Sequence, residues 1–326
     1  MHKSLKVIAM LLHRSVGWSR RLSARYIGCI GWAMKQLPDG AWKAYVINSL
    51  RAAPWPQGIE LSPVTVSLGG LAAVCLVPHL QEFDFTAIAY RVLPYEPEVF
   101  TWLKDRRYDV VLEIGANVGV FSLFLAAGQP EAAIYVFEPA REAYRRLLQN
   151  IQLNGRSNLQ AFNCAVAPKS GFLDFFEPQD HLTNGSMFKE FAAQFSSEVT
   201  HNKAIAIDCE ALEPLIAKAS RVLIKIDIEG AEPIVLNGMR ELLRKYQPDL
   251  LIEVLEDTAP RLNDLTFLLD GTYQLYHLTK DGPVRRRQFV PGDCRDYALI
   301  PAEASGSVSG QQARSQSPKY LARGAC

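Results

Sequence analysis

The sequence predicts a doubly wound α/β fold built on a mainly parallel sheet. Between residues 110 and 300, short apolar runs alternate with helical stretches, a pattern typical of sheets covered by helices on both faces. Two of these runs end in glycine and acidic residues, at the position where open α/β sheets bind ligands. The composition of the 326-residue chain, with 48% hydrophobic and 21% charged residues, is that of a folded globular protein.

The expected elements follow this alternation in order. Strands are expected at 110–114, 133–137, 160–165, 221–227 and 249–255, with a final pair near 272–278 and 296–300. Helices are expected at 118–127, 140–153 and 232–246, and another is expected to start within 98–104. The stretch 178–204 is expected to be a loop-rich insertion that contributes to substrate specificity.

The chain outside this core divides by composition. Residues 1–51 carry nine Lys or Arg and a single acid, Asp39, although the whole chain has a net charge of only +1. We therefore expect a basic helical N-terminal extension over 1–58, which either caps the main body or makes weak contact with a membrane surface. A β-hairpin lobe is expected over 59–94, the α/β domain over 95–301, and a disordered tail over 302–326.

Targeting and cysteine signals are weak. The apolar run Val7–Leu12 is too short to cross a bilayer, and no small-residue cleavage site follows it. The six cysteines are scattered and form no zinc-binding spacing. These features favour a reduced, cytoplasmic setting with neither signal peptide nor transmembrane anchor.

The first strand leads into a glycine loop. Gly115 and Gly119 allow the backbone to pass close to a ligand, because they carry no Cβ. Glu138 closes the second strand, nineteen residues after Gly119, where a carboxylate binds both hydroxyls of a ribose. An ordinary strand-to-helix turn would explain the glycines alone, but Glu138 together with them predicts an adenosine-type ligand.

The residues of the loop distinguish between adenosine ligands. Asn117 and Val120 stand where a dinucleotide fingerprint has glycines, so the loop is poorly suited to a pyrophosphate. Glu113 would repel a pyrophosphate and attract the ammonium of a methionine moiety. S-adenosylmethionine therefore fits this loop better than NAD.

A second charged strand runs through 221–227. Lys225, Asp227 and Glu229 recur at a spacing of two residues, which predicts that all three point to one face. Buried charges need a partner or a site to serve, so we expect them at the open end of the strand, where Glu253 from the next strand converges. The alternative is an edge strand with a solvated ionic face.

Together these segments resemble the FkbM-type methyltransferases over residues 95–274. The glycine loop is common to class I methyltransferases, whereas the Lys-x-Asp-x-Glu-Gly-x-Glu element is specific to this family. The matching segments are Glu113-x-Gly115-x-Asn117-x-Gly119, Phe137-Glu138-Pro139 and Lys225-Ile226-Asp227-Ile228-Glu229-Gly230-Ala231-Glu232. The resemblance implies a Rossmann-like, seven-stranded sheet, S-adenosylmethionine as cofactor, and usually O-methylation of a saccharide or another secondary metabolite.

The resemblance also implies roles for individual residues. Glu113, Gly115 and Asn117 would hold the methionine end of the cofactor, Glu138 the ribose and Ala165 the edge of the adenine. Glu96 and Gly119 would complete the cofactor site, and Asn184, Ser186 and Glu253 would face the substrate. Two features depart from the family: Ile207-Asp208-Cys209-Glu210 replaces its usual Leu-Asp pair, and the N-terminal 90 residues have no clear counterpart.

We expect Asp227 to act in catalysis by accepting or orienting the acceptor hydroxyl, because an alcohol needs help to lose its proton. Lys225 would fix the carboxylate, and Glu229 or Glu253 would complete the acceptor shell. His181 and His201 are alternative bases, although a lone loop histidine is usually solvated. A divalent cation could bind the three acids, but Lys225 argues against it, so no metal is assigned.

Other functions remain open at this stage. One is an NAD-dependent dehydrogenase, and another is a non-catalytic nucleotide-binding module attached to a membrane or glycan surface. An RNA-base methyltransferase is disfavoured because the main domain is acidic and lacks an Asn-Pro-Pro-Tyr-like loop. The expected partner is thus a small-molecule or glycan acceptor rather than nucleic acid, and the oligomeric state is left open.

Overall fold

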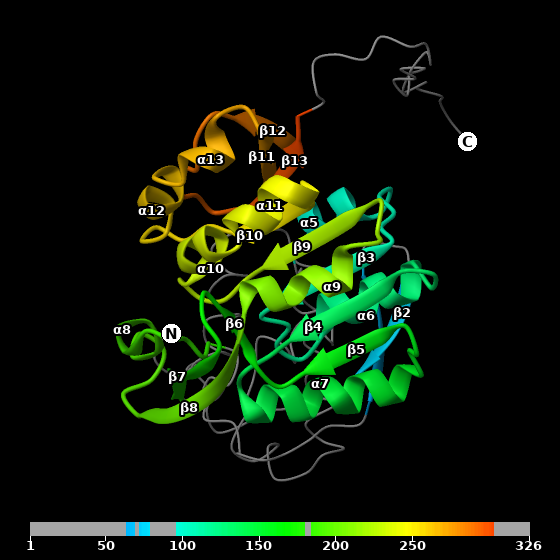
Figure 1. The fold of residues 1–326 in the computed structure, drawn as a ribbon. Helices are drawn as coiled ribbons and strands as arrows, with labels where there is room; N and C mark the ends of the chain where they lie inside the picture. Colours follow the sequence, from blue (N-terminus) through cyan, green and yellow to red (C-terminus); the bar gives the residue numbers. More distant parts are fainter. Residues whose placement is uncertain (1–62, 69–71, 79–95, 180–183, 303–326) are drawn as a thin grey trace, which may run out of the picture.

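The computed structural model describes residues 63–68, 72–78, 96–179 and 184–302. Their centre is an eight-stranded sheet in the order β12-β11-β13-β10-β9-β3-β4-β5 (Figure 1). The strands from β10 to β5 are parallel, and β13, β11 and β12 extend the sheet in antiparallel pairs. The predicted doubly wound, mainly parallel fold is confirmed.

The elements lie close to their expected positions. The strands of the main sheet are β3 (Val110–Ile114), β4 (Ala133–Phe137), β5 (Leu159–Phe162), β9 (Val222–Ile226), β10 (Asp249–Glu253), β11 (Tyr273–Thr279), β12 (Gly282–Arg286) and β13 (Asp296–Pro301). The helices are α5 (Pro97–Leu103), α6 (Val120–Gly128), α7 (Arg141–Asn154), α8 (Lys189–Ala192), α9 (Glu213–Ile216), α10 (Glu232–Gly238), α11 (Arg240–Tyr246), α12 (Ala259–Asn263) and α13 (Thr266–Leu269), with a 3₁₀ turn, η1, at Cys209–Leu212.

The sheet has one strand more than the seven that the family resemblance implies. The additional strand, β12, forms a hairpin with β11 through a tight turn in which Gly282 adopts a φ of +112°. Its residues are mostly exposed, its last two residues are Arg285 and Arg286, and Arg287 follows directly. It therefore lacks the apolar pattern that marked the other strands.

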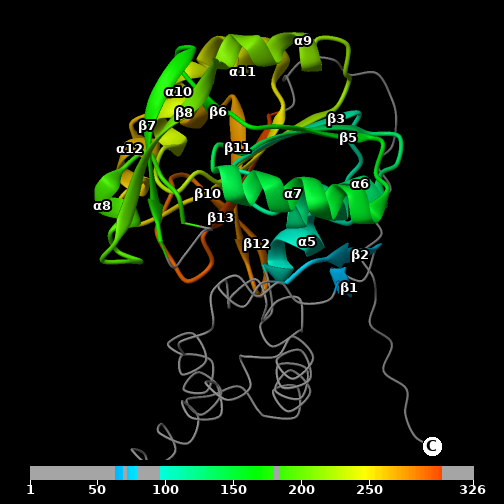
Figure 2. The ribbon, with the colours of Figure 1, turned by 90° about the horizontal axis from the view of Figure 1, so that it is seen from below.

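The apolar side chains of the central strands alternate between two cores, one on each face of the sheet. Helices α5, α6 and α7 cover one face, where Phe100, Phe121 and Leu147 pack against Val111 and Leu223. Helices α9 to α12 cover the other face and pack against the alternate strand residues (Figure 2). Because both faces are covered, the carboxyl edge of the strands is left as the place for a site.

The N-terminal hairpin of β1 (Val64–Leu68) and β2 (Ala72–Leu76) packs on helices α6 and α7. Val66, Val74 and Leu76 are buried in the same core as α6. Asn150 of α7 accepts a hydrogen bond from the backbone N–H of Val77, at 3.0 Å. The expected hairpin is therefore present, and its described strands share a core with the α/β domain.

The stretch between β5 and β9 contains a second, three-stranded sheet that the sequence did not predict; the loop-rich insertion expected over 178–204 lies mostly between two of its strands. Its order is β6-β8-β7, from β6 (Ala165–Ala167), β7 (Gly171–Pro178) and β8 (Val199–Asp208). The strand expected over 160–165 is consequently divided between β5 and β6. Residues 165–208 were not recognised as strands because β7 and β8 are largely exposed, which weakens the apolar signal.

Three expectations concern residues that the structure does not describe. The basic extension over 1–58 and the tail from 303 onward lie outside the described residues, as does His181. None of the helices in the described ranges combines the length and apolar character that a membrane crossing requires.

Candidate active site

A pocket of about 260 Å³ opens at the carboxyl ends of β3, β4, β9 and β10. All of the predicted site residues except Gly119 and Ser186 line it: Glu96, Glu113, Gly115, Asn117, Glu138, Ala165, Asn184, Lys225, Asp227, Glu229 and Glu253. The strand order β10-β9-β3-β4 spreads these residues along the sheet edge, with Glu253 at one end and Glu138 at the other. The pocket therefore has two chemically distinct ends.

Gly115 is required by close packing of two strand ends. Its φ is +87°, and a Cβ at this position would lie 1.8 Å from the backbone oxygen of Asp227. The amide of Asp227 in turn donates to the carbonyl oxygen of Ile114, at 3.0 Å. The glycine thus allows the loop after β3 to lie directly against the end of β9.

Gly119 has a packing role that the sequence did not predict. It does not line the pocket but precedes α6 in the left-handed conformation, with a φ of +87°. A Cβ there would lie 2.4 Å from Leu147 Cδ1, so the glycine allows α6 and α7 to pack closely. The assignment of Gly119 as a direct cofactor contact stays a prediction, and the structure adds this packing role.

Glu138 is held at the β4 end of the pocket by backbone amides. The N–H of Asn117 donates to Glu138 Oε2 at 2.7 Å, and the N–H of Ala140 donates to Oε1 at 2.8 Å. Burial raises the pKa of Glu138 to about 7, against the opposing effect of these two donors. The carboxyl group is therefore fixed in orientation, with oxygen lone pairs left for further donors.

An apolar wall lies beside Glu138. It is formed by residues of α7 and the small second sheet, namely Ala140, Ala143, Ala165, Val166, Leu173 and Phe175. Small side chains leave room for a flat ring, and Phe175 provides an aromatic surface. This end of the pocket suits a planar, mainly apolar group next to a hydroxylated one.

Glu113 and Lys225 are cross-strand neighbours in the middle of the sheet edge. Glu113 is 2% exposed, accepts a short hydrogen bond from the Ser122 hydroxyl, and has Oε1 4.0 Å from Lys225 Nζ. Burial raises the pKa of Glu113 to about 7, against the lowering effect of Lys225. Ser122, in the first turn of α6, was missed because a serine in an apolar helix carries no distinctive signal.

Lys225 makes its shortest ionic contact with Asp227, at 2.9 Å between Nζ and Oδ2. Its ammonium group also lies 4.4 Å from the centre of the Phe121 ring. Burial alone would lower the pKa of Lys225, but the carboxylates of Asp227 and Glu113 outweigh it and raise the pKa. Lys225 is therefore a permanent cation that holds Asp227 at the pocket.

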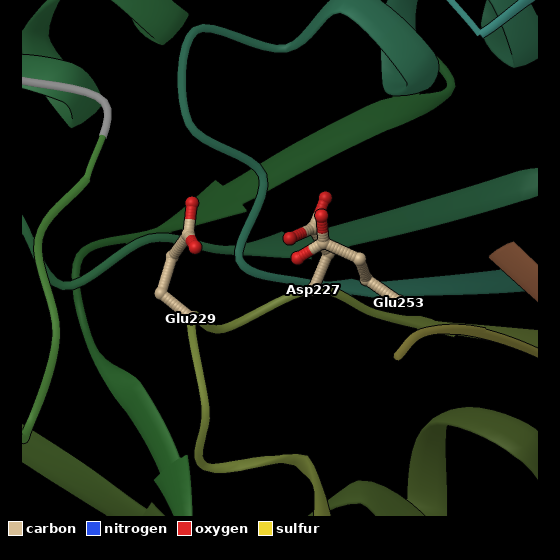
Figure 3. Close-up of side chains that lie close together, drawn as sticks. All are labelled: Asp227, Glu229 and Glu253. Carbon is tan, nitrogen blue, oxygen red and sulfur yellow. The ribbon is translucent and has the colours of Figure 1, made fainter. Parts of the chain in front are cut away.

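Asp227, Glu229 and Glu253 each have one carboxyl oxygen within 4.8 Å of the other two. Figure 3 shows the three side chains close together. Burial, reinforced by the neighbouring carboxylates, raises the pKa of Glu229 to about 8 and that of Glu253 well above its usual value. Glu253 receives a contact from the exposed Arg295 at 3.4 Å. The predicted convergence of Glu253 on the crevice is thus observed.

Glu229 reaches this cluster from a loop and not from the strand. Strand β9 ends at Ile226, and Glu229 adopts a left-handed conformation with a φ of +54°. Glu232 fixes the loop, since its Oε1 accepts hydrogen bonds from the amides of Ile228 at 3.0 Å and Gly230 at 3.1 Å. The expectation that spacing alone aligns Lys225, Asp227 and Glu229 on one strand face is corrected accordingly.

Ser186 lies behind the pocket wall. Its side chain is fully buried, its hydroxyl donates to the Glu229 carbonyl at 2.9 Å, and it accepts from the Phe188 amide at 3.1 Å. Ser186 therefore positions Glu229, and its assignment as a substrate contact stays a prediction. Asn184 does line the pocket, with Nδ2 3.5 Å from Glu229 Oε1.

Sequence reasoning also missed Asp296. This residue is 6% exposed on β13, directly opposite Glu253, and burial raises its pKa to about 7. No motif flags it, because its place depends on antiparallel pairing between two distant strands. His201, considered as an alternative base, instead lies exposed on β8 in contact with Asp174.

The sequence matches the family model described as "Methyltransferase FkbM domain" over residues 113–275. The chain is 24% identical over 244 residues to Methyltransferase 1 of Beauveria bassiana, covering 70% of this chain and 91% of that protein. It is 35% identical over 85 residues to Methyltransferase sdnD of Sordaria araneosa, which is 23% of this chain and only 32% of that protein.

Solved structures show weaker overall similarity. The FkbM methyltransferase of Methylobacillus flagellatus KT aligns with a TM-score of 0.39 at 15% identity, over 68% of this chain and 53% of that one. A SAM-dependent methyltransferase from Agrobacterium tumefaciens also gives a TM-score of 0.39 at 15% identity, over 76% of this chain and 72% of that one.

Proposed function

Because the chain belongs to the FkbM methyltransferase family, we propose that it transfers a methyl group from S-adenosylmethionine to a hydroxyl oxygen of a saccharide or another secondary metabolite. The observation that supports this proposal most strongly is the two-ended pocket. One end provides an apolar wall and a carboxylate fixed by amides, and the other provides an ion-paired aspartate.

The residues at the β4 end fit the cofactor. Glu138 has its carboxylate oriented by the amides of Asn117 and Ala140, so it would accept hydrogen bonds from both ribose hydroxyls. The apolar wall that includes Ala165 would take the adenine. Glu96 and Glu113 would offer negative charge to the ammonium of the methionine moiety, and Gly115 would allow the backbone to approach it.

The chemistry of transfer assigns a role to Asp227. When bound, the cofactor supplies an electrophilic methyl group on a positively charged sulfur. As the acceptor oxygen forms its bond to this methyl carbon and the sulfur–carbon bond breaks, the hydroxyl loses its proton, which Asp227 would accept. Lys225, 2.9 Å away, holds the carboxylate in place, and Glu229 and Glu253 would contact the acceptor.

Two alternatives are less well supported by the same geometry. An NAD-dependent dehydrogenase would place a pyrophosphate near the buried Glu113, which would repel it. A non-catalytic binding module would need no ion pair between the buried Lys225 and Asp227 at the pocket, and this pair favours an enzyme.

The test is calorimetry of the purified protein with S-adenosylmethionine, S-adenosylhomocysteine and NAD, followed by a search for methylated products. We expect both sulfur compounds to bind and NAD to bind at least about 100-fold more weakly, a difference of about 2.8 kcal/mol. Tighter binding of NAD would contradict the proposal. Binding of S-adenosylmethionine without turnover on any hydroxylated acceptor would favour the binding module.

A further inference from the structure

The acceptor end of the pocket has more acidic than basic side chains. Lys225 is the only lysine, arginine or histidine among the described residues that line the pocket. Its ammonium is already engaged by Asp227 at 2.9 Å and by Glu113 at 4.0 Å. Among the described residues, no second cation lines the pocket to pair with Glu229 and Glu253.

The surroundings of these two glutamates do not remove the imbalance. Arg295 approaches Glu253 only from outside, at 3.4 Å, and its side chain is 58% exposed, so solvent weakens its effect. Asp296, on the neighbouring strand, adds another buried acid beside Glu253. The nearest neutral group is Asn184, whose amide nitrogen lies 3.5 Å from Glu229 Oε1.

The backbone conformation of Glu229 has to be stabilised by neighbouring residues. A left-handed conformation is unfavourable for a residue with a side chain, and four hydrogen bonds from three side chains hold the loop in it. Glu232 binds the amides on either side, Ser186 donates to the Glu229 carbonyl, and Arg261 donates to the Gly230 carbonyl at 3.0 Å. The pocket thus presents a second acid next to Glu253 at a conformational cost.

From this arrangement we infer that the acceptor carries a positively charged amino group close to the hydroxyl that is methylated, as in an amino sugar or another amino alcohol. This inference rests on the proposed function and narrows its acceptor class. An ammonium group would supply the missing positive charge and three hydrogen-bond donors to Glu229 and Glu253. An acceptor with a carboxylate or phosphate at the same place would be repelled.

A neutral polyol or a metal ion fits the observations less well. A polyol could donate hydrogen bonds, but it would supply no positive charge to the neighbouring acidic groups. A divalent ion would need Asp227 as a ligand, yet Lys225 already occupies one oxygen of that carboxylate and adds a positive charge beside it. The ammonium of an organic acceptor requires only Glu229 and Glu253.

The experiment compares matched sugars on protein saturated with S-adenosylhomocysteine, in a chelator-containing buffer. Binding of glucosamine, N-acetylglucosamine and glucuronate is measured by ligand-observed NMR titration. We expect glucosamine to bind at least about 10-fold more tightly than N-acetylglucosamine, and glucuronate not to bind. Failure of glucosamine to bind, or equal binding of the three sugars, would overturn the inference.

Variants of the two glutamates test whether these side chains cause the preference for the amino sugar. Glu229→Gln and Glu253→Gln should each reduce the ratio of glucosamine to N-acetylglucosamine affinity by at least about threefold. Glu241→Gln removes the same charge from a side chain that is 79% exposed on α11 and should leave the ratio unchanged. An unchanged ratio in both pocket variants would overturn the inference, as would a Glu241→Gln variant that behaves like them.

Two further controls distinguish an amine site from a metal site, and failure of this inference from failure of the proposed function. Titration with Mg²⁺ in place of sugar, without chelator, should show no binding that depends on Glu229 and Glu253; micromolar binding that both variants abolish would assign the charge to a metal instead. Calorimetry with S-adenosylhomocysteine precedes each titration. If the wild-type protein does not bind S-adenosylhomocysteine, the proposed function fails, whereas binding without amine preference refutes only this inference.

Discussion

The two ends of the pocket are built by different means. At the β4 end, main-chain groups determine the geometry: two amides hold Glu138, and Gly115 fits where no Cβ could. At the β10 end, side chains determine it, because Asp227, Glu229 and Glu253 come together from strand ends and a strained loop. Substitutions on the acceptor side should therefore leave the geometry of the β4 end unchanged. The β10 end can be adapted to different acceptors by changing its side chains.

The two ends should therefore respond differently to substitutions. Substitutions at the β4 end should change cofactor affinity, because they alter a site preformed by the backbone. Substitutions at the β10 end should change turnover or acceptor choice while cofactor affinity is kept. The following predictions test that separation, beginning with the largest expected effect.

The largest effect is expected on turnover from Asp227→Asn. An amide cannot accept the hydroxyl proton as a carboxylate does, so turnover should fall by about 10²- to 10⁴-fold. Affinity for S-adenosylhomocysteine should change by less than about twofold, since this variant leaves Glu138 and the apolar wall intact. The assay measures S-adenosylhomocysteine release from S-adenosylmethionine and an unmethylated, hydroxylated acceptor; normal turnover would refute the role given to Asp227.

Gly115→Ala should abolish detectable binding of S-adenosylhomocysteine. The new Cβ would lie 1.8 Å from the Asp227 backbone oxygen, so the loop would have to move away from β9. Calorimetry measures the loss, and circular dichroism checks that the variant is folded. The matched control is Gly128→Ala at the end of α6, where a Cβ meets nothing within 4 Å; that variant should bind normally. Normal binding by both variants would contradict the close-packed loop.

Glu138→Gln should weaken S-adenosylhomocysteine binding by about 10- to 100-fold, or about 1.4 to 2.8 kcal/mol. The amide group would turn an NH₂ toward the N–H of Asn117 or Ala140, where only an oxygen can accept. Its control is Glu131→Gln, the same change at an exposed position before β4. Equal affinities in the two variants would remove Glu138 from the cofactor site.

The affinity for S-adenosylhomocysteine should depend on pH through Glu138. The pKa of Glu138 is raised by burial to about 7, and two ribose hydroxyls would require its deprotonated form. Affinity for S-adenosylhomocysteine should therefore increase by about 10-fold from pH 6 to pH 8, the ratio of deprotonated fractions for a pKa near 7. Calorimetry across this range, with Glu138→Gln as the variant in which the dependence is reduced, provides the measurement.

The stability of the ligand-free protein should decrease as pH rises, whereas the affinity for S-adenosylhomocysteine should increase. Carboxyl groups whose folded pKa lies above the unfolded value bind more protons in the folded state, so they stabilise the protein at low pH and lose this effect as pH rises. Glu113 and Glu138 both have a folded pKa of about 7. The melting temperature of the ligand-free protein should thus decrease between pH 5 and pH 8; an increase would contradict the burial of these groups as carboxylic acids.

The smallest effect is expected from chelation. Although the oxygens of Asp227, Glu229 and Glu253 lie within 4.8 Å of one another, Lys225 pairs with Asp227 and takes the place of a cation. Turnover in excess EDTA should therefore remain within about twofold of its starting value. A loss that Mg²⁺ or Mn²⁺ restores would show that the β10 end holds a metal.

The sequence predicted the β4 end better than the β10 end for a physical reason. Gly115 and Glu138 occupy fixed positions relative to a strand end, so local spacing was enough to place them. Glu253 could be placed because parallel strands end at one edge. Asp296 and Ser186 could not, since their positions depend on antiparallel pairing and on an isolated bridge between Phe176 and Ser186.

The fold was predicted with the same limits. Buried strands such as β3 and β9 are continuous apolar runs and were placed within a residue or two. The exposed strands β7, β8 and β12 have mixed side chains and were missed, although β6 and β7 supply much of the apolar wall. Exposed strands depend on partners distant in sequence, which local patterns do not reveal.

A crystal structure of the complex with S-adenosylhomocysteine tests the central claim most directly. We expect the ribose hydroxyls on the carboxylate of Glu138, the adenine against Ala165 and Phe175, and the sulfur facing the side of the pocket that carries Asp227. A nucleoside bound anywhere else, or a sulfur turned away from Asp227, would contradict the assignment of the two ends.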